Sequence, residues 1–242
     1  MKYAAVLAVF LLVPFAGLRE RPVKVNLGPV VQSQLDGRLN ERIGEFDTAG
    51  CTFVRCVTAL AYCYGLPTAI EYADRDAAHR TLNLKFHDQS LREVFAALVQ
   101  QTPEYRIEFN DGIVDVYSPR ARADDSNVLN RVIRDYRVTQ RETRDADFDL
   151  FCALGKKLGS RWCGGSIAFG AWGPTRISLH LQNAKAYEVI NAIAAQNGRA
   201  IWTVTAPPNR MSKIQDGGSW YISPLEPSYQ EDVVERLERA SR

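Results

Sequence analysis

Cys163 is the residue whose surroundings come nearest to those of a catalytic thiol. It lies in the glycine-rich stretch WCGGS at 162–166, which has room for backbone donors, and His180 is the nearest histidine in sequence. A nucleophilic cysteine needs a base within hydrogen-bonding distance and a lowered pKa. No local signature of a cysteine enzyme is present, so the stretch is more typical of a loop thiol. An exported enzyme that uses Cys163 remains an alternative.

The other patterns that serve catalysis or metal binding are missing from the sequence. The three histidines are scattered and no C-x-x-C occurs, so zinc-ligand spacing is not found. Gly164-Gly165 is not followed by the Lys-Ser/Thr of a phosphate-binding loop. The acid pairs Asp124-Asp125 and Glu231-Asp232 lie in polar stretches, as solvated charges do. We therefore expect no catalytic residue, no metal site and no cofactor.

Tryptophans and one long loop fit a binding role better. All four tryptophans fall in the second half of the chain, where Trp202 has a core-facing strand position. Trp162 and Trp172 lie in glycine-rich sequence, and exposed tryptophans often anchor interfaces. They could instead cover the core, or stack on the sugars of a cell-wall glycan or hold another small ligand.

The segment 206–218, APPNRMSKIQDGG, is long for a hairpin loop, and long loops are often functional. Its basic and apolar residues are binding candidates: Arg210, Met211, Lys213 and Ile214.

Five cysteines in an exported chain leave at least one unpaired within the chain. Cys56 and Cys63 are seven residues apart in a helical pattern, roughly 10 Å along a helix, which is too far for a disulfide. Both fall on an apolar stripe, so we expect buried thiols. Cys152 and Cys163 flank an expected helix end and could form a disulfide.

The N-terminal sequence indicates export. An apolar run from Ala4 to Gly17 follows a single lysine, and it is shorter than the ~20 residues of a membrane-spanning helix. We expect a signal peptide at 1–17, a periplasmic or secreted protein, and no stable membrane insertion after cleavage. The alternative is an anchor formed by the uncleaved N-terminal helix. A net charge of +2 makes nucleic acid a poor candidate partner.

The same pattern of strands and helices occurs twice in the chain, and the candidate residues would lie on it. In its first copy, alternating apolar residues at 82–86 predict a strand, and Ser90-x-x-Glu93 has the spacing of a capping box. A helical stripe ends before Pro103, and Asp111-Gly112 predicts a hairpin turn. The stripe consists of Leu91, Val94, Phe95 and Leu98.

The second copy starts 95 residues later, at Ile177, with Asn183 in the place of Asp88 and Gly198 as the helix stop. Its helical stripe is Ala186, Val189, Ile190 and Ile193. A strand and a helix are expected before each copy, with Phe53, Val57, Leu60 and Tyr64 on the first helix and Phe148, Phe151, Leu154 and Leu158 on the second.

The complete unit is βαββαββ, so we expect an α+β fold with two tandem repeats whose amphipathic helices pack on short mixed sheets. The expected boundaries are repeat 1 at 38–119, a linker at 120–131, repeat 2 at 132–225 and a charged C-terminal helix or tail at 226–242.

This repeat resembles the secretin and TonB short N-terminal domain (STN). FDTAGCTFVRCVTALAYCYGLPTAIEY resembles its first half, and LNLKFHDQSLREVFAALV with YRIEFNDGIVDVYSP resembles its second. The resemblance implies small α+β domains of the periplasm that make protein–protein contacts. The pore or barrel that normally follows such domains has no counterpart here. What carries over as an expectation is a non-enzymatic interaction module of the cell envelope with an unidentified envelope protein as partner, by analogy of fold.

Overall fold

The computed structural model describes residues 29–72, 75–125, 127–157, 175–205 and 221–223. The fold is mixed α/β, with helices packed on short sheets. The first half contains α1 Pro29–Leu39, β1 Arg42–Asp47, α2 Phe53–Cys63, β2 Thr68–Tyr72, α3 Arg75–Ala78, β3 Lys85–Ser90, α4 Leu91–Gln100, β4 Arg106–Asn110 and β5 Ile113–Tyr117. The second half contains α5 Pro119–Ala123, the 3₁₀ helix η1 Val128–Asn130, β6 Val132–Glu142, α6 Thr143–Lys157, β7 Arg176–Lys185, α7 Ala186–Asn197, β8 Ile201–Thr205 and β9 Tyr221–Ser223.

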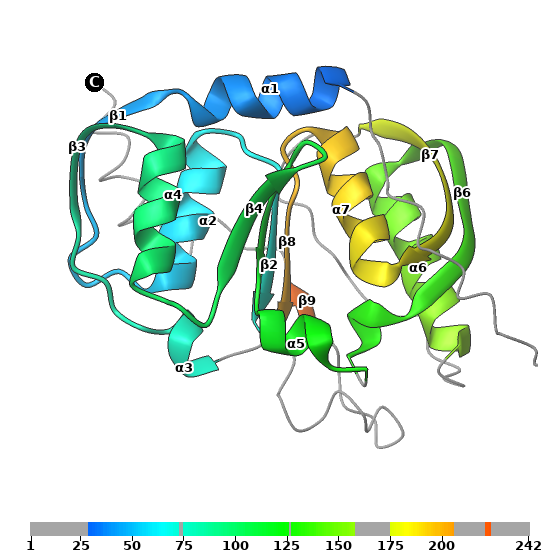
Figure 1. Cartoon of the computed structure of the whole chain (residues 1–242). Coiled ribbons are helices and arrows are strands. Elements are labelled where there is room, and N and C mark those ends of the chain that lie inside the picture. The colour runs from blue at the N-terminus through cyan, green and yellow to red at the C-terminus, as the bar shows by residue number, and fades with distance from the viewer. Residues whose placement is uncertain (1–28, 73–74, 126, 158–174, 206–220, 224–242) are drawn as a thin grey trace, which may run out of the picture.

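A five-stranded mixed sheet with the order β4-β5-β2-β8-β9 forms the centre of the molecule. β2 runs parallel to both β5 and β8, while the β4–β5 and β8–β9 pairs are antiparallel. The sheet therefore contains strands from both halves of the chain. In Figure 1, α2 and α4 lie on one side of this sheet and α6 and α7 on the other. The ribbons β1–β3 and β6–β7 form the outermost layers (Figure 1).

Two hydrophobic cores lie on opposite faces of the central sheet. Successive residues of a strand point to opposite faces. Ile70 of β2 accordingly belongs to the first core, and its neighbour Ala69 belongs to the second. Val114 and Ile113 of β5 are divided in the same way. Trp202 is fully buried in the second core, as its strand position predicts.

The predicted helices α4 and α7 are confirmed, and all eight residues of their two apolar stripes are completely buried. Ser90 caps α4: its hydroxyl accepts the Glu93 N–H at 3.3 Å, and the Glu93 carboxylate accepts the Ser90 N–H at 2.7 Å. At α7 only the second bond is made, from the Lys185 N–H to Glu188 at 2.6 Å. A lysine side chain has no acceptor, so it cannot complete the box.

The predicted core face of α6 is wrong in one respect. Phe148 was expected to face the core, but it is 48% exposed. Leu154 is buried as predicted, while Ala146 and Leu150 are buried in place of Phe148, so the buried face of the helix is rotated away from Phe148. Phe151 and Leu158 lie outside the side chains that the structure describes. The sequence of α6 offers apolar residues on more than one face, and packing against α7 selects among them.

The ribbons β1–β3 and β6–β7 have the same irregularity. In each ribbon the pairing skips one position, which is Gly44 opposite Asp88 in the first ribbon and Arg134 opposite Asn183 in the second. The second ribbon also has a register shift between Val138 and Arg141. Asp88 and Asn183 both have φ = 51°, a left-handed conformation that Asp and Asn tolerate better than most residues. The alternation predicted a strand that begins at Leu82. The observed β3 begins three residues later, at Lys85, and continues through Asp88 to Ser90, the N-cap of α4.

Candidate functional site

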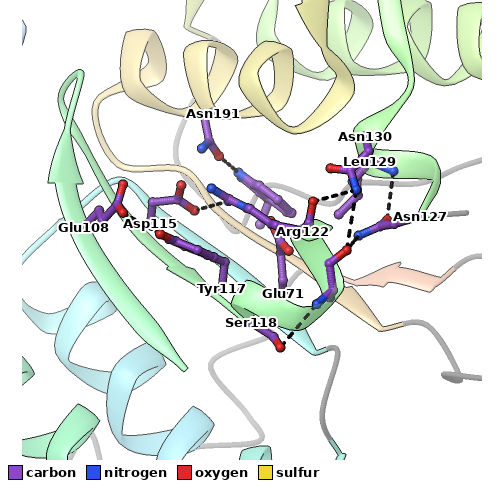
Figure 2. Close-up of polar contacts among 12 residues, drawn as sticks. Glu71, Glu108, Asp115, Tyr117, Ser118, Arg122, Asn127, Leu129, Asn130 and Asn191 are labelled. Carbon is purple, nitrogen blue, oxygen red and sulfur yellow. Dashed lines mark hydrogen bonds and ion pairs between the residues drawn. The ribbon is translucent and has the colours of Figure 1, made fainter. Parts of the chain in front are cut away.

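A sealed cluster of charges lies where the two halves of the chain meet. Arg122 of α5 donates from Nε to Glu71 Oε1 at 2.8 Å and from an Nη atom to Asp115 Oδ1 at 2.8 Å. Glu71 comes from β2 and Asp115 from β5, and Figure 2 shows both carboxylates pointing toward Arg122 between the sheet and α7. The side chains are 2%, 9% and 15% exposed for Glu71, Asp115 and Arg122.

Two aromatic rings lie against the guanidinium. Arg122 lies 3.9 Å from the ring centroid of Tyr117 and 4.0 Å from that of Tyr187. A planar guanidinium stacks on aromatic rings while its N–H groups remain free for in-plane hydrogen bonds. Tyr117 belongs to β5 and Tyr187 to α7, so the contact joins the two halves.

The segment predicted to be a linker positions Arg122. Ser118 accepts the Ala121 N–H at the start of α5, and Pro119 occupies the first helical turn, where proline is favoured. Asn127 and Asn130 then donate to the Ala121 and Arg122 carbonyls at 3.0 Å each. These bonds join α5 to Asn127 and to the 3₁₀ helix η1, whose Leu129 is buried in the second core.

Burial dominates the electrostatics of this cluster. It raises the pKa of Glu71 to about 7, even though Arg122 acts in the opposite direction. It also raises the pKa of Asp115, against the effect of Arg122 and of a hydrogen bond from Asn191. Burial alone would lower the pKa of Arg122, but the two carboxylates raise it above its usual range. Glu71 Oε2 is buried and has no hydrogen-bond partner among the described residues.

This cluster is not suited to bind or transform a substrate. The charges are almost completely removed from solvent, and no cysteine or serine hydroxyl is hydrogen-bonded to its carboxylates among the described contacts. Within the described ranges, no group of three His, Cys, Asp or Glu side chains is placed to hold a metal ion. Its evident chemical capacity is to hold charge, and protons, at the junction of α5, α7 and the sheet.

The edge strand β4 is a second candidate site, and it is accessible. Among the described strands it pairs with β5 alone. Asp111 and Gly112 have φ values of 53° and 77°, as a two-residue type I′ hairpin requires. In such a hairpin, paired residues alternate between hydrogen-bonded and non-hydrogen-bonded pairs, starting from a bonded pair at Asn110 and Ile113. The backbone N–H and C=O groups of Ile107 and Phe109 therefore point away from β5.

Helix α1 covers one end of this edge. Gln32 donates to the Phe109 C=O at 3.2 Å and accepts the Gly112 N–H at 2.9 Å. The remaining outward groups are the N–H and C=O of Ile107 and the N–H of Phe109, and none of them has a partner within the described part of the chain. Arg106, Glu108 and Asn110 are exposed beside them.

All six binding residues predicted from the sequence lie outside the described residues. These are Trp162, Trp172, Arg210, Met211, Lys213 and Ile214, together with Cys163 and the whole of 1–17 and 226–242. The disulfide between Cys152 and Cys163 therefore remains a prediction, with Cys152 half-buried. Of the two thiols expected on an apolar stripe, Cys56 is completely buried and Cys63 partly. The described acids Asp124 and Asp125 are exposed, as expected.

The sequence analysis missed the charged cluster, although the sequence contains a signal for it. Asp115 lies between Val114 and Val116 in a strand, and Glu71 follows Ala69-Ile70 in another. Acids inside apolar strands need a buried partner. Arg122 could not be recognised as that partner, because it lies among other arginines in a polar run.

No family model matches the chain, and neither the curated proteins nor the solved structures contain a match to it. Within the described residues, no helix has both the length and the apolar character needed to cross a membrane.

Proposed function

We propose that the protein is a non-enzymatic interaction module of the cell envelope that binds an extended segment of a partner protein along β4. The observation that carries this proposal is the accessible edge of β4, where three backbone groups of Ile107 and Phe109 point outward beside exposed polar side chains. An edge strand of this kind can pair with an added strand, whose main-chain hydrogen bonds supply affinity. Export follows from the predicted signal peptide and is part of the proposal.

The proposal includes an internal duplication of an STN-like unit. Asp88 and Asn183 have the same φ and are 95 residues apart. The first N–H of α4, from Leu91, bonds to the Glu41 C=O at 2.9 Å, and that of α7, from Ala186, bonds to the Arg131 C=O at 2.9 Å. The N3 glutamates of the two helices accept equivalent N–H groups. Agreement in order, spacing and local conformation supports a common origin of the two halves.

Substitution of Ile107 by proline tests the edge. Ile107→Pro removes one outward N–H without removing a donor from the β4–β5 ladder, and proline is tolerated on edge strands. Ile107→Ala is the matched control, because it shortens the same side chain but keeps the N–H. The full chain and both variants are used as bait in crosslinking pull-downs from envelope extracts.

The proposal requires a partner that the wild-type protein and Ile107→Ala capture and that Ile107→Pro loses by tenfold or more, with all three folded by circular dichroism. Equal capture by all three proteins would exclude the edge as the binding site. Capture of no partner by the wild-type chain would overturn the proposed function itself.

A further inference from the structure

The cluster of Glu71, Asp115 and Arg122 contains one more potential negative charge than positive charge. Both carboxylates bond to the same guanidinium, and Glu71 Oε2 points into the protein without a described partner. If both acids were ionised, a net charge of −1 would be enclosed in a site from which water is nearly excluded. Isolated charges are very costly in such surroundings, and buried groups usually avoid the cost by taking up or losing a proton.

Few other titratable groups face the cluster, and none supplies a second positive charge among the described contacts. On β5, Tyr117 stacks on Arg122 and donates its hydroxyl to Glu108 of β4. On α7, the ring centroid of Tyr187 lies 4.0 Å from the Arg122 guanidinium, and Lys185 Nζ lies 5.6 Å from the same centroid. Asn191 is neutral and also accepts the Trp202 N–H at 3.1 Å. Burial raises the pKa of Tyr117 and of Tyr187 to about 12, so both stay neutral at physiological pH.

Because of where the cluster lies, its protonation state affects how the helices pack on the sheet. Glu71 and Asp115 are on the central sheet, whereas Arg122 is on α5 and Tyr187 and Asn191 are on α7. A charge imbalance here therefore acts on the contact by which α5 and α7 pack on the sheet (Figure 2). We propose that Glu71 and Asp115 share one exchangeable proton, and that release of this proton weakens the attachment of α5 and α7 to the central sheet. This proposal does not depend on the proposed binding of a partner along β4.

The pH dependence follows from the raised pKa of Glu71. An acid whose pKa is higher in the folded protein binds more protons there, so stability is greatest at low pH and falls as pH rises from about 4.5 to about 7. Because the two acids are coupled, the titration belongs to the pair. For a pKa of about 7 in the folded protein, the unfolding constant rises on the order of a hundredfold between pH 5 and pH 8 through this cluster alone.

Neutralising the acids singly and together is the decisive experiment. Glu71→Gln and Asp115→Asn each leave one carboxylate for Arg122, so each should remove the excess pH dependence of urea unfolding that the wild-type full chain shows. Glu41→Gln is the control, because it changes an exposed acid between α1 and β1, outside the cluster, and it should keep that dependence. The double variant leaves Arg122 without a counter-charge and should be destabilised at every pH by more than the two single changes together.

Two further measurements complete the test. Amide exchange in α7, taken relative to exchange in α4 on the other face of the sheet, should be faster in the wild-type protein than in Glu71→Gln at pH 8 but not at pH 6, because global unfolding affects both helices alike. An infrared band of a protonated carboxyl should disappear between pH 6 and pH 8 in an Asp147→Asn background, used because Asp147 is another buried acid with a raised pKa. Unchanged pH dependence in both single variants would overturn the proposal. If neither variant folds, the infrared band decides, and its absence overturns the proposal.

Discussion

Arg122 does what no other residue type could do at its position. Its planar guanidinium bonds to two carboxylates while it lies about 4 Å from the centroids of two aromatic rings, at 3.9 Å and 4.0 Å. A lysine ammonium could pair with the acids, but it could not fill the space between Tyr117 and Tyr187 as a flat group does. Buried ion pairs contribute little net stability when they form, yet removal of one partner is costly because the other charge stays buried. We therefore expect the removal of Arg122 to lower stability by more than the net stability that its ion pairs contribute.

We predict that Arg122→Met lowers the free energy of unfolding by about 3–5 kcal/mol at pH 8, because two buried carboxylates lose their counter-charge. The loss should shrink toward pH 5, where both acids can be protonated and need no counter-charge. Urea unfolding at the two pH values measures both effects.

The matched control is Arg92→Met. Arg92 pairs with Asp36 at 2.7 Å and lies 4.8 Å from the Phe109 ring centroid, but the two charged side chains are 41% and 44% exposed. A screened surface pair of this kind is worth at most about 1 kcal/mol. A cost for Arg122→Met no larger than that for Arg92→Met would show that the cluster is not coupled to folding.

The helices α4 and α7 differ in how their N-terminal N–H groups are satisfied. α4 has both bonds of a capping box, whereas α7 has only the bond to Glu188, because Lys185 occupies the cap position. The side-chain acceptor of an N-cap satisfies a backbone N–H that the helix leaves without a partner. The contribution of an N-cap acceptor to stability can therefore be compared at two helices of the same protein.

We predict that Ser90→Ala destabilises the protein by about 1 kcal/mol, and that Lys185→Ser stabilises it by about 0.5 kcal/mol because it supplies the missing acceptor. Lys185→Ala separates this gain from the loss of the contact between Lys185 and the Tyr187 ring. Thermal unfolding of the three variants gives the order. If Lys185→Ser proves no more stable than Lys185→Ala, the cap is not the reason.

Elements with strong local signals were predictable, and elements set by packing were not. Periodic stripes with nearby caps located α4 and α7, and Asp111-Gly112 located the β4–β5 turn. α1 was missed because its sequence, PVVQSQLDGRL, has no apolar stripe, and Leu35 and Leu39 alone are buried among its described side chains. α5 was missed because a five-residue helix depends on Ser118 and the asparagines that follow it. The charged cluster could not be placed from the sequence either, because its residues come from four elements, β2, β5, α5 and α7.

Three connections join the two halves into one structure. β2 pairs with β8 over five residues, from Thr68 opposite Ile201 to Tyr72 opposite Thr205. Arg122 and its ring contacts join α5 and α7 to the sheet. Arg38 of α1 donates to the carbonyls of Gly65, which follows α2, and of Gly198, which follows α7. Because β2 has β5 on one side and β8 on the other, neither half has a complete sheet without the other.

The shared sheet predicts that the two halves unfold together. Leu60→Ala in the first core and Ile193→Ala in the second each remove a completely buried side chain, at a cost of about 2–5 kcal/mol. In a cooperative molecule either change should lower the protection of the slowest-exchanging amides in both α2 and α7 by the same factor, and urea unfolding should stay a single transition. Native-state hydrogen exchange measures this directly. If Leu60→Ala lowered protection in α2 and left α7 unchanged, the β2–β8 pair would join two independently stable units, and the central sheet would not be the common core of the protein.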